Sequence, residues 1–264
     1  MDAAQRGMRF IFFLLACLML MPPAAALAMV GGAREAGITE GARHAVLIVS
    51  SRGSSCTGTA IARDLVLTAA HCVLPGADYK LVEFDAARGP VLKDVAQVVR
   101  HPGFSLQSLQ AQRATADIAL LKLAEPLAPR FAPAALSTNP APTQTGGRFL
   151  VAGYGVTVRG DGKSGGTLRL AELAATGRPG NLQLRLVDPA TNNAGPGLGA
   201  CTGDSGAPVF TRTGASLFLI GVVSWSTAPN NAGGCGGLTG VTPIALYRGW
   251  VVEAAGKLGS GVAE

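Results

Sequence analysis

The stretch Gly203-Asp204-Ser205-Gly206-Ala207-Pro208 decides how this sequence of 264 residues is interpreted. It places a serine hydroxyl in a glycine-rich turn, whose backbone N–H groups are free to face a negative charge that develops nearby. A serine hydroxyl becomes a nucleophile only when a neighbouring base takes its proton. Taken alone, the stretch is more often an ordinary turn, so the rest of the chain must supply the base.

Two further segments supply a base and an acid. Leu67-Thr68-Ala69-Ala70-His71-Cys72 contains a histidine, and Asp117-Ile118-Ala119-Leu120-Leu121 begins with an aspartate. A neutral imidazole takes a proton near neutral pH, and a buried carboxylate holds the required tautomer of the ring. Each segment alone is more often structural. Together, His71, Asp117 and Ser205 predict nucleophilic catalysis.

The order of these residues along the chain distinguishes between folds. An α/β-hydrolase needs its histidine after the serine, but His44, His71 and His101 all precede Ser205. The subtilisin order is compatible with Asp64 and His71, but it requires a chain with many helices. We interpret His44 and His101 as surface or core residues.

Short apolar or alternating segments bounded by Gly, Pro, Asp or Asn predict antiparallel strands. These are residues 45–50, 58–62, 65–68, 95–100, 118–123, 149–152, 183–187, 208–211 and 217–224. Residues 125–147 are rich in Pro and Ala and predict a linker, and only residues 244–257 have helical spacing. With 36 glycines and 14% charged residues, the composition excludes a disordered chain or a coiled coil.

The first residues have the features of a secretory signal. Arg6 and Arg9 precede an apolar run from residue 10 to 21, and residues 26–28 place the cleavage before Met29. Residues 24–26 fit the same rule and would leave Leu27 first. An uncleaved anchor, or a lipid on Cys17, are alternatives. We expect export, to the periplasm or the medium.

Four cysteines remain after that cleavage: Cys56, Cys72, Cys201 and Cys235. An even number in an exported chain predicts two disulfides, with three possible connectivities. Zinc is disfavoured because the chain has no Cys-x-x-Cys pair and no paired histidines. We expect neither a metal nor a cofactor.

The formal charge of +6 is scattered and aromatic residues make up only 5%, so nucleic-acid binding is not predicted.

With these motifs, the chain resembles the chymotrypsin/trypsin family of serine endopeptidases, including bacterial secreted members. The resemblance covers about residues 29–258 and rests on TAAHC, DIALLKL, GDSGAPV and Val223-Ser224-Trp225. It implies an all-β fold of two antiparallel six-stranded β-barrels with a C-terminal α-helix. The expected domains are a signal peptide at 1–28, an N-terminal barrel at 29–135, and a C-terminal barrel with the helix at 136–264.

The resemblance also assigns roles to residues. His71 would be the general base, Asp117 would orient it, and Ser205 would be the nucleophile. The N–H groups of Gly203 and Ser205 would form the oxyanion hole. The disulfides implied are Cys56–Cys72 and Cys201–Cys235.

Other residues would bind the substrate. Ser224, Trp225 and Ser226 would pair with its backbone as an added strand. Gly199 would lie at the base of the pocket for the substrate side chain. Ala200 and Gly240 are also expected to bind the substrate. Because no acid stands at Gly199, we expect a neutral, mostly apolar residue before the scissile bond. Ser226 would narrow the entrance, and Asp188 is a remote candidate for a hidden acid.

Met29-Val30-Gly31-Gly32 resembles the activated N-terminus of the family. The resemblance implies that a free α-amino group of Met29 pairs with Asp204 and orders the oxyanion loop. No propeptide separates Met29 from the predicted signal, so signal cleavage itself would activate the enzyme. A flexible lead-in segment is the alternative interpretation.

The sequence therefore predicts a secreted, monomeric serine endopeptidase acting on protein or peptide substrates, without a nucleic-acid partner and without a membrane after signal cleavage. A non-catalytic protease-like binding protein is the alternative from another class, but such relatives usually lose a member of the triad. A chaperone-protease with an added peptide-binding module is disfavoured, because two barrels use up the mature chain.

Overall fold

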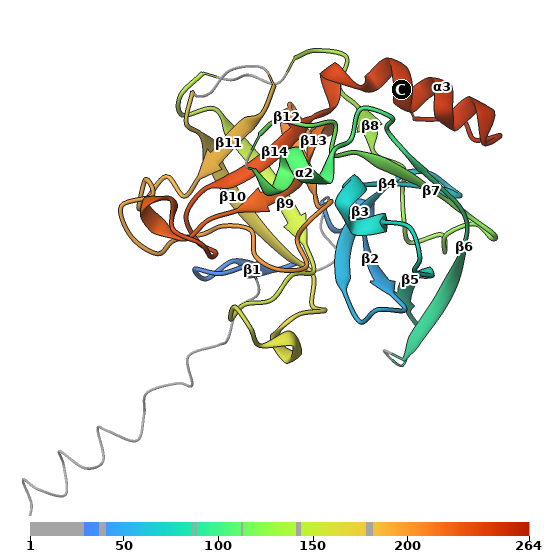
Figure 1. The fold of residues 1–264 in the computed structure, drawn as a ribbon, viewed down its shortest axis with the longest axis horizontal. Coiled ribbons are helices and arrows are strands. Elements are labelled where there is room, and N and C mark those ends of the chain that lie inside the picture. The colour runs from blue at the N-terminus through green and yellow to red at the C-terminus, as the bar shows by residue number, and fades with distance from the viewer. Residues whose placement is uncertain are drawn as a thin grey trace, which may run out of the picture.

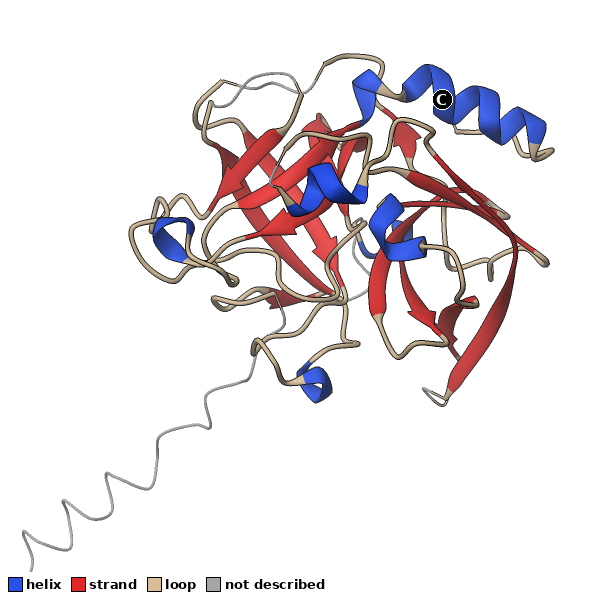
Figure 2. Ribbon diagram, viewed as in Figure 1, coloured by secondary structure: helices blue, strands red, loops and turns tan. Residues whose placement is uncertain are grey.

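Two antiparallel six-stranded barrels make up most of the fold, as Figures 1 and 2 show. The computed structural model describes residues 29–36, 41–85, 87, 89–111, 113–140, 144–177 and 182–263. The predicted signal, both of its cleavage sites after residues 26 and 28, and Cys17 lie in or at the edge of residues 1–28, outside the described part. The predicted fold class, including the C-terminal helix, is confirmed.

The first barrel closes in the order β2-β3-β4-β7-β6-β5. Its strands are β2 (Ala45–Ser50), β3 (Ser55–Ala62), β4 (Leu65–Thr68), β5 (Tyr79–Phe84), β6 (Pro90–Arg100) and β7 (Ala119–Leu123). The β3–β4 hairpin turns at residues 63–64, and β7 pairs with both β4 and β6. This pairing places the two chain segments that carry His71 and Asp117 next to each other, because one follows β4 and the other precedes β7.

The second barrel closes because β9 pairs with both β10 and β12. Its strands are β9 (Arg148–Gly153), β10 (Arg169–Ala175), β11 (Leu184–Val187), β12 (Pro208–Thr213), β13 (Ser216–Ser226) and β14 (Thr239–Pro243). The Ser205 turn leads directly into β12. The strand register shifts between Val223 and Trp225 on β13, so an irregularity falls at the predicted substrate-binding segment.

The N-terminal strand packs on the second barrel, and the C-terminal helix packs on the first. Strand β1 (Arg34–Glu35) pairs with β10, and helix α3 (Arg248–Lys257) buries Val251 and Ala255 in a cluster that also contains Leu67 and Leu120. Burying a side chain such as that of Val251 stabilises a fold by roughly 1.5–3 kcal/mol, and the smaller methyl group of Ala255 contributes less. The division between residues 135 and 136 stays a prediction; β8 (Ala135–Leu136) lies there and pairs in parallel with β13.

The remaining elements are short. They are helix α2 (Leu106–Gln110) and the 3-10 turns Ala42–His44, Ala70–Val73, Gly162–Ser164, Pro229–Asn231 and Ile244–Leu246. The predicted helix over residues 244–257 is therefore two elements, a 3-10 turn followed by α3. Among the described residues, no helix is both long enough and apolar enough to span a membrane.

Candidate active site

His71 and Asp117 lie in contact at the junction of the two barrels. Asp117 is fully buried, and its Oδ2 accepts a hydrogen bond from His71 Nδ1 at 2.8 Å. Its Oδ1 accepts the backbone N–H of His71 at 2.9 Å. Ser224 Oγ, from β13 of the second barrel, donates to Oδ2 at 2.5 Å. An ionised carboxylate only accepts, so Nδ1 carries the proton and Nε2 keeps a lone pair.

Ser205 and His71 line one open cleft of about 330 Å³. The other residues around this cleft include Gly203, Ala200 and Trp225. His71 is on the 3-10 turn Ala70–Val73, whereas Ser205 precedes β12, so the cleft lies where the two barrels meet. The structure thus brings the three predicted triad residues to one place from three distant parts of the sequence.

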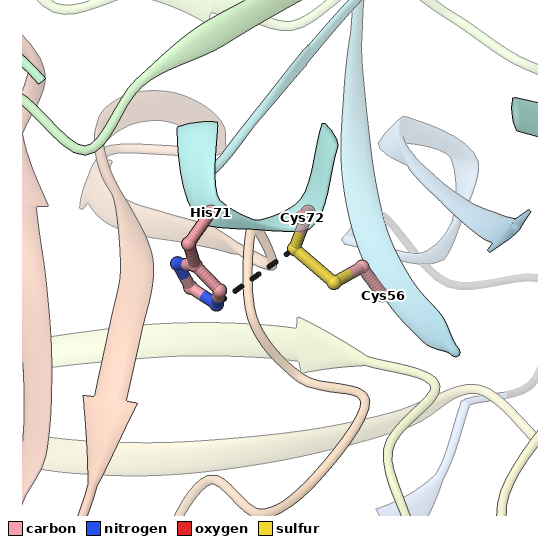
Figure 3. Close-up of side chains that lie close together, drawn as sticks. All are labelled: Cys56, His71 and Cys72. Atoms are coloured by element: carbon pink, nitrogen blue, oxygen red, sulfur yellow. Dashed lines mark hydrogen bonds between the residues drawn. A yellow bond between two sulfur atoms is a disulfide. The ribbon is translucent and has the colours of Figure 1, made fainter. Parts of the chain in front are cut away.

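The histidine also adjoins a disulfide. Figure 3 shows His71 Nε2 pointing toward Cys72, with 3.9 Å between Nε2 and Sγ. Cys56 and Cys72 are joined with an S–S length of 2.03 Å, and Cys201 and Cys235 form the second disulfide. These are the pairs that the family resemblance implied. Cys56, His71 and Cys72 are close enough for a metal site, but bonded sulfurs offer no thiolate ligand.

Glycine is required on both sides of the Ser205 turn. Gly203 has φ +95°, and a Cβ there would lie 2.9 Å from Gly155 Cα. Gly206 has φ +79°, and a Cβ there would lie 2.2 Å from the carbonyl oxygen of Thr57. Within the described part of the chain, no acceptor faces the N–H groups of Gly203 and Ser205. These two donors are therefore available for an oxyanion.

Thr57, on β3, is a site residue that the sequence reasoning missed. This fully buried side chain donates from Oγ1 to the carbonyl oxygen of Gly203 at 2.8 Å and accepts the N–H of Tyr154 at 3.0 Å. Its backbone N–H donates to the carbonyl oxygen of Ser205 at 2.8 Å. The only sequence signal was its position next to Cys56. Thr57 ties the first barrel to the Ser205 turn.

Asp204 is the second fully buried carboxylate of the site. Its oxygens accept the backbone N–H groups of Gly155 and Cys201, each at 2.8 Å. Burial raises the pKa of Asp204 to about 7, against the opposing effect of these two hydrogen bonds. No cation pairs with it among the described residues.

Met29 lies close to this carboxylate. It is fully buried, and a Cβ at Gly153 would meet both Asp204 Oδ1, at 2.1 Å, and Met29 Cε, at 3.1 Å. The next residue, Val30, forms an antiparallel bridge with Gly199. The side chain of Met29 therefore lies near Asp204, and the pairing of its amino group with that carboxylate stays a prediction.

The predicted substrate-binding residues fall into two groups. Ala200, Trp225 and Ser226 line the cleft, together with the neighbouring Val223. The side chain of Ser224 points to Asp117, and the pairing of its backbone with a substrate stays a prediction. Neither Gly199 nor Gly240 is among the residues that line the cleft. A Cβ at Gly240 would lie 2.0 Å from the Trp225 ring, so this glycine makes room for the indole.

Thr239 was also missed by the sequence reasoning. It stands opposite Ser226 in the strand register, is fully buried, and its Oγ1 accepts the N–H of Ala200 at 3.0 Å. No acidic side chain lines the cleft in the described part of the chain. Asp188 instead accepts the N–H groups of Ala190 and Leu198, each at 2.8 Å, and so fixes its own loop.

Comparisons with known proteins agree with the fold of two barrels. The family model described as Trypsin matches residues 30–251. The chain belongs to the trypsin family of serine proteases.

Individual relatives extend this finding. The chain is 30% identical over 243 residues to the vitellin-degrading protease of Bombyx mori, with 84% of each chain covered. It is 29% identical over 238 residues to vitamin K-dependent protein C of Mus musculus, and it spans only 49% of that protein's length. The structure of neuropsin, a serine protease expressed in the limbic system of mouse brain, matches with a TM-score of 0.64 at 22% identity, over 84% of this chain and 98% of neuropsin. The last match supports the fold alone.

We expect Thr57→Val to loosen the Ser205 turn, because valine keeps the shape but leaves the Gly203 carbonyl and the Tyr154 N–H without their partner. Unpaired buried groups cost about 1–3 kcal/mol, and a misplacement near 1 Å costs roughly a hundredfold in rate. The readout is the rate constant for labelling of Ser205 by a fluorophosphonate, which should fall by about tenfold to a hundredfold.

Thr57→Ser is the matched control, since it keeps the hydroxyl and should recover most of the labelling rate. Equal rates for the valine and serine variants would contradict a positioning role.

Proposed function

We propose that this protein is an exported serine endopeptidase that cleaves peptide bonds through an acyl-enzyme on Ser205. The observation that carries the proposal is the buried Asp117 carboxylate, which holds His71 by both its ring and its backbone beside a cleft that Ser205 also lines. Membership of the trypsin family supports the same chemistry.

In the proposed reaction, His71 Nε2 takes the proton of Ser205 Oγ as the oxygen bonds to the scissile carbonyl carbon. Asp117 stabilises the resulting imidazolium, and the N–H groups of Gly203 and Ser205 donate to the oxyanion. The C–N bond then breaks, and His71 gives its proton to the departing amine. A water molecule repeats these steps on the acyl-enzyme and releases the acid product with Ser205 restored.

The proposed side-chain preference is for a small or medium neutral residue before the scissile bond. Ala200, Ser226 and the adjacent Thr239 support this, because they are small uncharged residues around the cleft. A Lys or Arg side chain would enter a cleft whose lining, in the described part of the chain, includes no acidic residue.

The proposed activation step is removal of residues 1–28. A free amino group at Met29 would place a cation beside Asp204, whose carboxylate accepts two neutral backbone N–H groups and no charged donor among the described residues. The pair would order the turn that contains Gly203 and Ser205.

We further propose an extracytoplasmic location, a monomeric state, and a barrel boundary near residues 135–136.

Wild-type protein should react with a fluorophosphonate at a single serine, Ser205, and Ser205→Ala should show no labelling. By analogy with other triads, that variant should lose about a millionfold in turnover of a peptide substrate. Mass spectrometry of the labelled peptide identifies the site. Ser216→Ala removes an exposed hydroxyl from the same barrel and should label normally. A folded wild-type protein that does not label would favour the non-catalytic binding protein.

Peptide anilides that differ only at the residue before the scissile bond test the side-chain preference. We expect kcat/KM for Ala, Val or Leu to exceed that for Arg by about a hundredfold, because a charge without a partner is costly to bury. Ser226→Gly should shift the preference toward larger side chains. Faster hydrolysis of the arginine substrate would contradict the proposed pocket.

The unprocessed chain should lose stability as the pH rises. Folded Asp204 keeps its proton up to about pH 7, whereas the unfolded residue releases it near 3.8. Within that window the unfolded state binds fewer protons, so the free energy of unfolding falls by about 1.4 kcal/mol per pH unit and then levels off. Urea unfolding between pH 4 and 8, in the Ser205→Ala background, measures this dependence.

Two chains serve as comparisons for that experiment. In the unprocessed chain, Asp204→Asn should abolish the fall in the free energy of unfolding between pH 4 and 8. A chain that begins at Met29 should also lack it, because the amino group lowers the pKa of the carboxyl. The same steep fall in the Met29 chain would contradict the pairing.

A further inference from the structure

A second cavity, of about 270 Å³, lies beside the cleft that holds His71 and Ser205. The two cavities share Trp225 and Ser226. Its other walls come from both barrels: Leu109 on α2 and Arg113 belong to the first, and Arg185 on β11 belongs to the second. We call this cavity the arginine pocket.

The floor of the arginine pocket is built by strand register. Trp225 on β13 stands opposite Gly240 on β14, and Gly240 stands opposite Arg185 on β11. Because Gly240 has no side chain, the indole of Trp225 occupies that space. The guanidinium carbon of Arg185 then lies 5.6 Å from the centroid of the Trp225 ring, within the range of a cation–π contact. This contact holds the arginine at the pocket.

The pocket carries positive charge without compensation. No acidic side chain lines it, and neither Arg113 nor Arg185 forms an ion pair with any residue in the described part of the chain. Arg185 Nε is buried and lacks a hydrogen-bond partner there. A carboxylate matches the planar donor set of a guanidinium best.

The edge of β13 leads a peptide to this pocket. From Val223 onward β13 pairs with β14, and its pairing with β12 ends at Val222, so one edge of residues 224–226 is open. An extended peptide advances about 3.3 Å per residue. Two or three residues therefore carry it from the Ser205 cleft past Trp225 to the arginine pocket.

We propose that the arginine pocket binds an Asp or Glu side chain of the substrate, at the third or fourth residue before the scissile bond. Arg185 and Arg113 are the specificity-determining residues. The inference rests on the proposed peptidase function and on the proposal that the residues before the scissile bond pair with Ser224, Trp225 and Ser226.

Acetyl-capped tetrapeptide anilides test the proposal, because the acetyl cap adds no carboxylate of its own. Glu, Gln and Lys are compared at the third and at the fourth position, with alanine elsewhere. We expect kcat/KM to be about tenfold higher for Glu than for Gln at one of these positions, and lower still for Lys. The ratio should shrink as salt is raised, since added ions screen exposed charges.

Arg113→Gln and Arg185→Gln should each lower the Glu-to-Gln ratio, and the double variant should bring it close to one. Arg148→Gln is the matched control: it removes the same charge from an exposed position on β9 outside the pocket and should keep the ratio. A ratio near one in wild type, or a preference that persists in the double variant, overturns the proposal.

A binding measurement separates this proposal from the proposed catalysis. Fluorescently labelled Glu and Gln peptides are titrated into Ser205→Ala, which needs no turnover. Tighter binding of the Glu peptide by about tenfold, lost on adding Arg185→Gln, supports the pocket even if wild type hydrolyses no peptide. Equal binding of the two peptides counts against the pocket even if wild type is an active peptidase.

Discussion

The burial of the Asp117 carboxylate is the constraint on which the arrangement of the two barrels depends. A carboxylate taken fully out of water destabilises the fold by several kcal/mol unless donors surround it. Two of its donors belong to His71 in the first barrel and the third is Ser224 in the second. The full set of donors is therefore assembled only where the two barrels meet. Ser224 is followed directly by Trp225 and Ser226, so the same contact places the strand along which a peptide would lie.

The second buried carboxylate, that of Asp204, differs in one respect. The donors of Asp117 include an imidazole that becomes a cation when it accepts a proton, whereas those of Asp204 are two neutral backbone N–H groups. Hydrogen bonds of this kind offset only part of the burial, which is why its pKa stays near 7. Asp117 therefore has a titratable partner in the folded chain, whereas no cation contacts Asp204 among the described residues. Thr57 links the surroundings of these two carboxylates. It belongs to the barrel that carries His71 and Asp117, and its Oγ1 donates to the carbonyl oxygen of Gly203, the residue before Asp204.

The sequence predicted the features that depend on local patterns. Alternating segments predicted most strands, and the chain order of His71, Asp117 and Ser205 selected the fold. Three barrel strands, β5, β10 and β14, were missed. The sequence of β10, RLAELAA, is made of good helix formers, and that of β14, TGVTP, contains Gly and Pro. All three are strands because their neighbours in the barrel supply hydrogen bonds. Thr57, Thr239 and the role of Gly240 could not be predicted, because each depends on a partner in another strand or loop.

The distribution of positive charge likewise separates what the local sequence predicts from what depends on the fold. In the sequence the basic excess is scattered, and no run of Lys or Arg indicates a binding surface. The fold changes this, because register aligns Trp225, Gly240 and Arg185 across three strands although they are far apart in the chain. Arg185, whose charge lies on an aromatic face and forms no ion pair with any described residue, differs physically from a solvated charge on a loop. Net charge counts the two kinds equally, so the composition of such a chain does not indicate which of its cations contact a substrate.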